Sequence, residues 1–259
     1  ETVPTSLPHE TDETIRTPAT SVEALEILAQ AQFKLGNSEE AFLYLDRAAE
    51  LCEQYQLSVL AFQVATLTIN LQWQKEGDAS KARQALPQLL TTIDATPNIN
   101  KIAQNLRYDI KLLRAQIASK ESDIELAELL FSQLKAALNE THSTTLTTDY
   151  HIQLANHYLA HNRNNLALSE LLIAYWSAVE NNASAQLAQV NRLLAQLFYE
   201  RQVFDKALSY LSQAADYYRH YDKSPALTHS LKMMGDIYYQ QGRYNLALVH
   251  YLNVIDHQV

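Results

Sequence analysis

An alanine recurs at a nearly constant step along this 259-residue chain, and the recurrence constrains the fold more than any other feature. Successive members lie 41, 45, 40, 40 and 40 residues apart. The six positions are Ala41, Ala82, Ala127, Ala167, Ala207 and Ala247. A period of this length is typical of arrays in which one supersecondary unit stacks on the next.

The same local pattern surrounds each of these alanines. Twelve residues earlier stands a residue that is small in five of the six copies: Ala29, Asn70, Ala115, Ala155, Ala195 and Gly235. Four residues later stands a large one: Leu45, Leu86, Phe131, Leu171, Leu211 and Tyr251. Between the small residue and the repeated alanine of each copy lies a short turn. Several of these turns contain a Gly or Asn that can take the left-handed conformation ending a helix. Each unit is therefore predicted to be two amphipathic helices joined by a tight turn.

The chain begins differently. Residues 1–19 are rich in Thr, Pro and Glu and lack periodic apolar residues, which predicts a flexible tail or linker. Thr20 and Glu23 have the spacing of a capping box, so the first helix is expected to start at Thr20. Residues 20–259 are then predicted to form a single solenoid domain. Within the second unit, Pro87 predicts a kinked helix or one that starts late.

The pattern of small and large residues resembles the tetratricopeptide repeat (TPR) family over about residues 21–255. It is matched best by Leu154-Ala155 with Tyr158 and by Met234-Gly235 with Tyr238. The resemblance implies an all-α fold, a right-handed α-α superhelix (TPR-like solenoid) of about six helix pairs whose first helices line a concave groove. The step near 40 exceeds the family's usual value of about 34. Repeats of that length resemble those in sensor regions of bacterial signalling proteins.

The family register also implies which residues face the groove. The positions lie three before, one after and four after the small residue of each first helix. The candidates for ligand or partner binding are Leu112, Gln116, Ile152, Asn156, Leu159, Arg192, Gln196, Tyr199, Lys232, Asp236 and Tyr239.

Three kinds of side chain occur among these candidates. The amides could hydrogen-bond a peptide backbone, or could simply be solvated. The leucines and Ile152 predict an apolar floor. Arg192 and Lys232, with Tyr199 and Tyr239, suit a carboxylate or small anionic ligand. The alternative is that the tyrosines pack between repeats while the cations stay solvated.

Composition and motifs exclude several classes of function. The net charge is −9 without a basic run, which disfavours nucleic-acid binding. No apolar run approaches the length of a membrane span. His157 and His161 have the spacing of two metal ligands, but a third ligand is missing nearby, so neither a metal nor another cofactor is expected. The single Cys52 excludes an intrachain disulfide. Catalytic motifs are absent, so the chain is predicted not to be an enzyme.

We therefore expect a non-catalytic binding module. The leading hypothesis is the sensory or protein-interaction domain of a bacterial signalling protein, of the membrane-anchored kinase or diguanylate cyclase type, which binds a peptide or small ligand in its groove. The alternatives are a scaffold that docks another folded protein and the peptide-sensing domain of a cytoplasmic transcription regulator. The Thr/Pro-rich start and low lysine content favour a periplasmic location, with the cytoplasm as the alternative.

The last helix lacks an obvious polar cap, which the ends of solenoids normally need. A further C-terminal domain or a homodimer is therefore expected to cover it.

Overall fold

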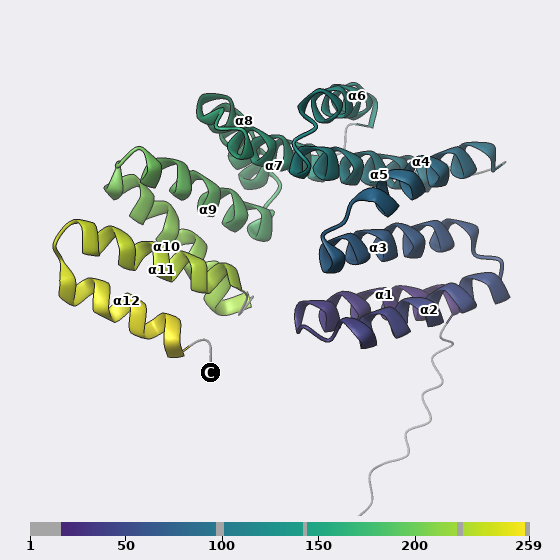
Figure 1. Cartoon of the computed structure of the whole chain (residues 1–259), viewed down its shortest axis with the longest axis horizontal. Coiled ribbons are helices and arrows are strands. Elements are labelled where there is room, and N and C mark those ends of the chain that lie inside the picture. Colours follow the sequence, from purple (N-terminus) through teal and green to yellow (C-terminus); the bar gives the residue numbers. More distant parts are fainter. Residues whose placement is uncertain (1–16, 97–100, 142–143, 222–224, 257–259) are drawn as a thin grey trace, which may run out of the picture. The chain divides into compact units, whose positions relative to one another are not determined.

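Helices make up the fold. The computed structural model describes residues 17–96, 101–141, 144–221 and 225–256, which form twelve α-helices and contain no strand (Figure 1). The helices are α1 (Pro18–Lys34), α2 (Ser38–Gln54), α3 (Ser58–Glu76), α4 (Ser80–Ala95), α5 (Lys101–Lys120), α6 (Ile124–Thr141), α7 (Thr144–Ala160), α8 (Asn164–Glu180), α9 (Ser184–Glu200), α10 (Phe204–Tyr221), α11 (Pro225–Gln240) and α12 (Tyr244–Asp256). The predicted all-α fold of helix pairs is confirmed.

The chain divides into two compact units, residues 1–114 and 115–259, and α5 crosses the boundary. In the first unit, α1, α2 and α3 pack on one another, and α4 packs on α3. In the second unit, each helix from α6 to α12 packs on the next in sequence. The single solenoid domain over residues 20–259 stays a prediction, and most of the predicted tail, residues 1–16, lies outside the described residues.

The turns within the pairs repeat with the period of the alanines. A residue with positive φ ends the first helix of every pair: Gly36, Gly77, Ser122, Asn162, Gln202 and Gly242. Their spacing of 41, 45, 40, 40 and 40 residues equals that of the alanines. Ser122 and Gln202 adopt this conformation although their side chains disfavour it by roughly 1–2 kcal/mol. The packing of the two helices therefore determines the turn, and a Gly or Asn only lowers the conformational free energy of the left-handed backbone.

The first helix begins earlier than expected. Thr17 is its N-cap, and the Thr17 side chain accepts a hydrogen bond from the Thr20 backbone N–H at 3.3 Å. Pro18 then occupies the first turn, where its missing N–H costs nothing. The prediction that Thr20 caps the helix is wrong, because the Thr20 hydroxyl donates back to the Thr17 carbonyl.

The repeated alanines lie in the core. All six are buried, as are the large residues four positions later in the first five pairs. The second pair departs from the pattern. Asn70 is only partly buried, while its neighbour Leu71, expected in the groove, is 5% exposed and packs in the core of the first unit. Pro87 lies inside a helix that runs from Ser80 to Ala95, so the prediction of a late start is wrong.

Gly235 lies at a close crossing of the two helices of the last pair. A Cβ at this position would lie 2.7 Å from Cε1 of Tyr251. The Tyr251 ring cannot move away freely, because its hydroxyl donates a 2.8 Å hydrogen bond to Asp236. The backbone of α11 therefore lies directly against an aromatic ring of α12.

This contact predicts the effect of Gly235→Ala. In an open helix the substitution stabilises by roughly 1 kcal/mol. Here the clash with Tyr251 should outweigh that gain, lowering the free energy of unfolding by a net ~1–2 kcal/mol, as measured by urea denaturation. In a Tyr251→Ala background the same substitution should be neutral or stabilising. An equal loss in both backgrounds would show that the ring is not the cause.

Candidate functional site

Helices α9 and α11 bring charged and aromatic side chains together in the second unit. The two helices are joined by Gln240 of α11, whose Nε2 donates a 2.7 Å hydrogen bond to the Tyr199 hydroxyl of α9. We refer to the surrounding group as the α9–α11 site, which consists of Arg192, Tyr199, His229, Lys232, Asp236, Tyr239 and Tyr251.

Asp236 organises the centre of this site. Its Oδ2 accepts from Lys232 Nζ at 2.9 Å, and its Oδ1 accepts from the Tyr251 hydroxyl at 2.8 Å. Burial and the bond to Asp236 raise the pKa of Tyr251 to about 12, so its hydroxyl stays protonated and a donor. The hydrogen bond to Asp236 also raises the pKa of Lys232. Lys232 is thus a cation that already has a carboxylate partner.

His229 is a member of the site that the family register did not identify. Burial lowers its pKa, and the positive charges of Arg192 and Lys232 lower it further, while Asp236 acts in the opposite direction. The charges of Arg192 on α9 and of Lys232 on α11 thus both act on His229. A signal was present in the sequence, since His229 precedes Lys232 by three residues and so shares its helix face.

The tyrosines of the site pack against the start of the second helix in their own pair. The Tyr199 ring lies 6.2 Å from that of Phe204, and the Tyr239 ring 5.4 Å from that of Tyr244. Tyr239 is still 60% exposed, whereas Tyr199 is partly buried. The site thus offers aromatic surface beside its charged groups.

The other predicted groove residues lie elsewhere. Ile152 is 1% exposed and belongs to the core between α7, α8 and α9, so the prediction that it forms a groove floor is wrong. An apolar branched side chain at this position has no polar end to carry to water, so it packs inward. Leu159 lies partly buried against the same core.

The amide side chains are only partly buried and bond within their own helices. Asn156 donates to Gln153 at 3.4 Å, and Gln196 donates to Glu200 at 3.2 Å. Gln116 in the second unit and Leu112 in the first are also partly buried. Peptide binding by the amides stays a prediction.

The two histidines of α7 form a separate buried polar group. His157 is 1% exposed, its Nδ1 lies 2.8 Å from the Ser119 hydroxyl, and its ring lies 4.7 Å from that of His161. The Nε2 atoms of both rings are buried without a hydrogen-bond partner. Within the described ranges, no cluster of three or more His, Cys, Asp or Glu residues is arranged to hold a metal ion.

Comparison with known proteins identifies the type of repeat formed by α9 to α12. Residues 186–256, which span α9 to α12, match a family model described as tetratricopeptide repeat. Over residues 186–256 the chain therefore carries tetratricopeptide repeats. Such repeats are protein-interaction scaffolds and are typically non-catalytic. A search of curated proteins found no match.

Among solved structures, BtubC (BKLC) shares the all-helical fold over nearly the whole chain. BtubC (BKLC) from P. vanneervenii is 16% identical, with a TM-score of 0.66 over 92% of this chain and 91% of that one. The apo form of RapI is 13% identical, with a TM-score of 0.42 over 91% of this chain and 76% of that one. Among the helices described, none is both long and apolar enough to cross a bilayer.

The buried His157 predicts that the stability of the helical array depends on pH. Burial, then the charge of His161, lowers its pKa below the usual 6.5. The neutral ring is therefore favoured in the folded state. The contribution of this neutral ring to the free energy of unfolding is fully present above pH 6.5, and it is lost as the pH falls through the lowered folded-state pKa. The free energy of unfolding, measured by urea denaturation at pH 7.5 and 5, should be smaller at pH 5.

His157→Gln should reduce this difference between the two pH values, because the new side chain does not titrate. His220→Gln, at an exposed position of α10, is the matched control and should leave the difference unchanged. An unchanged pH dependence in His157→Gln would contradict the assignment.

Proposed function

We propose that this TPR chain is a binding module that holds a peptide or small ligand at the α9–α11 site by an anionic group. The observation that supports this proposal is the convergence of Arg192, His229 and Lys232 beside exposed aromatic surface. In the described part of the chain, Arg192 makes no ion pair, so its guanidinium is available to a carboxylate in a bidentate geometry.

Lys232 has a different role in the proposal. Its ammonium already donates to Asp236, so an incoming anion must compete with that carboxylate. Binding then depends on the balance between Arg192 and His229, which attract the anion, and Asp236, which repels it. The apolar faces of Tyr199 and Tyr239 supply contact area for the remainder of the ligand.

The proposal extends to biological context. A ligand-holding repeat domain fits the sensory part of a bacterial signalling protein, and the repeat length near 40 residues supports that context. The Thr/Pro-rich start favours the periplasm for such a sensor. The peptide-sensing domain of a cytoplasmic regulator remains the alternative context for the same site.

A second candidate function is a scaffold that docks a folded protein. It is favoured by an exposed apolar surface on α8, formed by Leu172, Ile173, Trp176 and Val179. Trp176 is 62% exposed, and tryptophan is enriched among the residues that dominate protein interfaces. A scaffold would lose its partner on Trp176→Ala and be indifferent to changes at Arg192.

Substitutions at the α9–α11 site should change affinity in opposite directions. For peptides selected from a displayed library with free C-terminal carboxylates, Arg192→Ala with Lys232→Ala should weaken binding about tenfold or more, because charged hydrogen bonds are lost. Asp236→Asn should strengthen binding severalfold, since it frees Lys232 and removes the repelling charge. Isothermal titration calorimetry of the whole chain measures both changes.

The control removes two cations of α10 outside the site, by Lys206→Ala with Arg219→Ala. This pair should leave affinity unchanged. If the substitutions at Arg192 and Lys232 have no more effect than the control, the site does not bind the anion.

Binding at this site should also depend on pH. Protonated His229 adds a positive charge, and a bound anion favours the protonated form, so affinity should rise as the pH falls from 8 to 5.5. His229→Asn should flatten this dependence. Affinity that is constant with pH in the unsubstituted chain would contradict a role for His229.

A further inference from the structure

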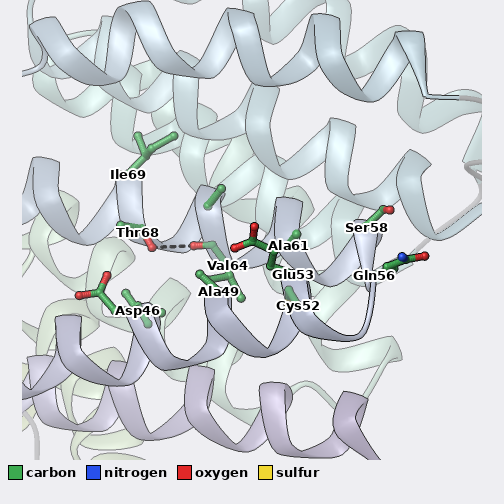
Figure 2. A pocket seen from close by; sticks show the side chains of 12 residues that line it. Asp46, Ala49, Cys52, Glu53, Gln56, Ser58, Ala61, Val64, Thr68 and Ile69 are labelled. Carbon is green, nitrogen blue, oxygen red and sulfur yellow. Dashed lines mark hydrogen bonds between the residues drawn. The ribbon is translucent and has the colours of Figure 1, made fainter.

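A groove with a volume of about 710 Å³ lies between α2 and α3 in the first unit. Its two walls are stripes of residues at helical spacing, which face each other in Figure 2. Ala49 stands on the wall from α2, and Ala61 and Ala65 stand on the wall from α3. Thr68 adds mainly its methyl group, because its hydroxyl donates to the Val64 carbonyl at 2.8 Å. The interior of the groove is thus largely apolar.

The groove exists because bulk is missing at one seam between repeats. We call a seam the contact between the second helix of one pair and the first helix of the next. The α2 side chains at this seam include Ala49 and Cys52, eight and eleven residues after Ala41. At every other seam, one or both of the equivalent positions carry a large apolar side chain: Leu90 and Ile93, Leu138, Tyr175, and Tyr218.

These larger side chains fill their seams. Ile93, Leu138 and Tyr218 are buried, and Tyr175 packs against the core between α8 and α9. The α2–α3 seam therefore lacks the large apolar side chain that fills each of the other seams. A side chain from a bound molecule can occupy this space.

Two carboxylates lie along the α2 wall of the groove. Asp46 and Glu53 are seven residues apart on one face of α2 and are both exposed (Figure 2). The basic residues of the two wall helices are engaged elsewhere. Arg47, the one cation of α2, pairs with Glu50 at 2.7 Å, and Lys75, the one cation of α3, lies over the Phe42 ring.

A comparison with the next seam shows that Glu53 lacks a cationic partner. Asp94 occupies the position equivalent to Glu53, and Arg107 of α5 pairs with it across that seam at 2.7 Å. Helix α3 offers no such cation to Glu53. Burial, and then the charge of Glu26 on α1, raise the pKa of Cys52 in the groove.

The length of the groove suits a helix. Its α2 wall runs from Leu45 to Glu53, which is about 12 Å or just over two helical turns at 1.5 Å per residue. Asp46 and Glu53 are about 10 Å apart along this wall, two turns of any helix lying beside it. Because many of the side chains that line the groove are small, the backbone of a bound helix can approach closely.

We propose that the α2–α3 groove binds an amphipathic α-helix of a partner protein, with apolar side chains in the groove and two cationic side chains, seven residues apart, on Asp46 and Glu53. This surface is separate from the α9–α11 site. The partner helix supplies both the missing bulk and the missing positive charge.

The test uses a fluorescein-labelled helical peptide of alanine and leucine that carries two lysines seven residues apart. Fluorescence anisotropy should show saturable binding to the whole chain, which weakens as salt rises. The peptide with glutamates in place of the lysines should bind at least tenfold more weakly. Binding should also slow the reaction of Cys52, the one thiol of the chain, with a maleimide reagent.

Two substitutions test the groove itself. Asp46→Asn with Glu53→Gln should weaken binding tenfold or more, whereas Glu39→Gln with Glu40→Gln, an equal charge change on the same helix, should not. Ala49→Tyr places in this seam the side chain that Tyr175 provides between α8 and α9. It should abolish peptide binding while the thermal midpoint stays the same or rises, which separates a filled groove from a misfolded one.

Three outcomes would overturn the proposal. The first is equal affinity of the lysine and glutamate peptides, or no difference between the two charge variants. The second is that dodecyltrimethylammonium, at submicellar concentration, protects Cys52 as well as the peptide does, because the groove would then be a small-molecule site. The third is sedimentation showing self-association that Ala49→Tyr abolishes, because a second copy of the chain would then fill the groove.

Discussion

The close crossing of two helices at a small side chain is the interaction on which the rest of the structure depends. In each pair an alanine of the second helix is buried, and in five of the six an alanine or glycine of the first helix is buried as well. This approach fixes the angle of the hairpin tightly enough that Ser122 and Gln202 accept a left-handed backbone to complete the turn. The repeating geometry is thus held by packing, which leaves the turn and surface positions free to vary between units.

That freedom explains how one repeat pattern supports two dissimilar surfaces. At the α9–α11 site the variation lies in the first helices, where charged and aromatic residues stand at positions that contribute apolar side chains in other repeats. At the α2–α3 groove the variation lies in the second helix, where Ala49 and Cys52 replace the bulk found at other seams. Neither change touches the alanines that fix the hairpins, so the array can acquire both without loss of its fold.

The sequence predicted the pairing of helices well, because the small–large pattern is a direct consequence of the crossings. It predicted exposure less well. Ile152, Arg192 and Lys232 occupy the same register position, yet Ile152 is buried, Arg192 is partly buried and Lys232 is exposed. A long cationic side chain can carry its charge to water along an apolar stem, while a branched apolar one gains only by packing inward. Register places a Cα, but side-chain chemistry decides where the remaining atoms lie.

Pairings within the α9–α11 site illustrate a second limit of sequence analysis. The spacing of Lys232 and Asp236, four residues apart on one helix, permits an ion pair, but the spacing alone does not predict that Tyr251 of the next helix holds the other oxygen of Asp236. With both oxygens engaged, Asp236 is fixed in place and cannot turn away from an approaching anion. For the anion proposed above, repulsion by Asp236 is therefore a cost that follows from the packing of α12 on α11, because Tyr251 both holds Asp236 and packs against Gly235.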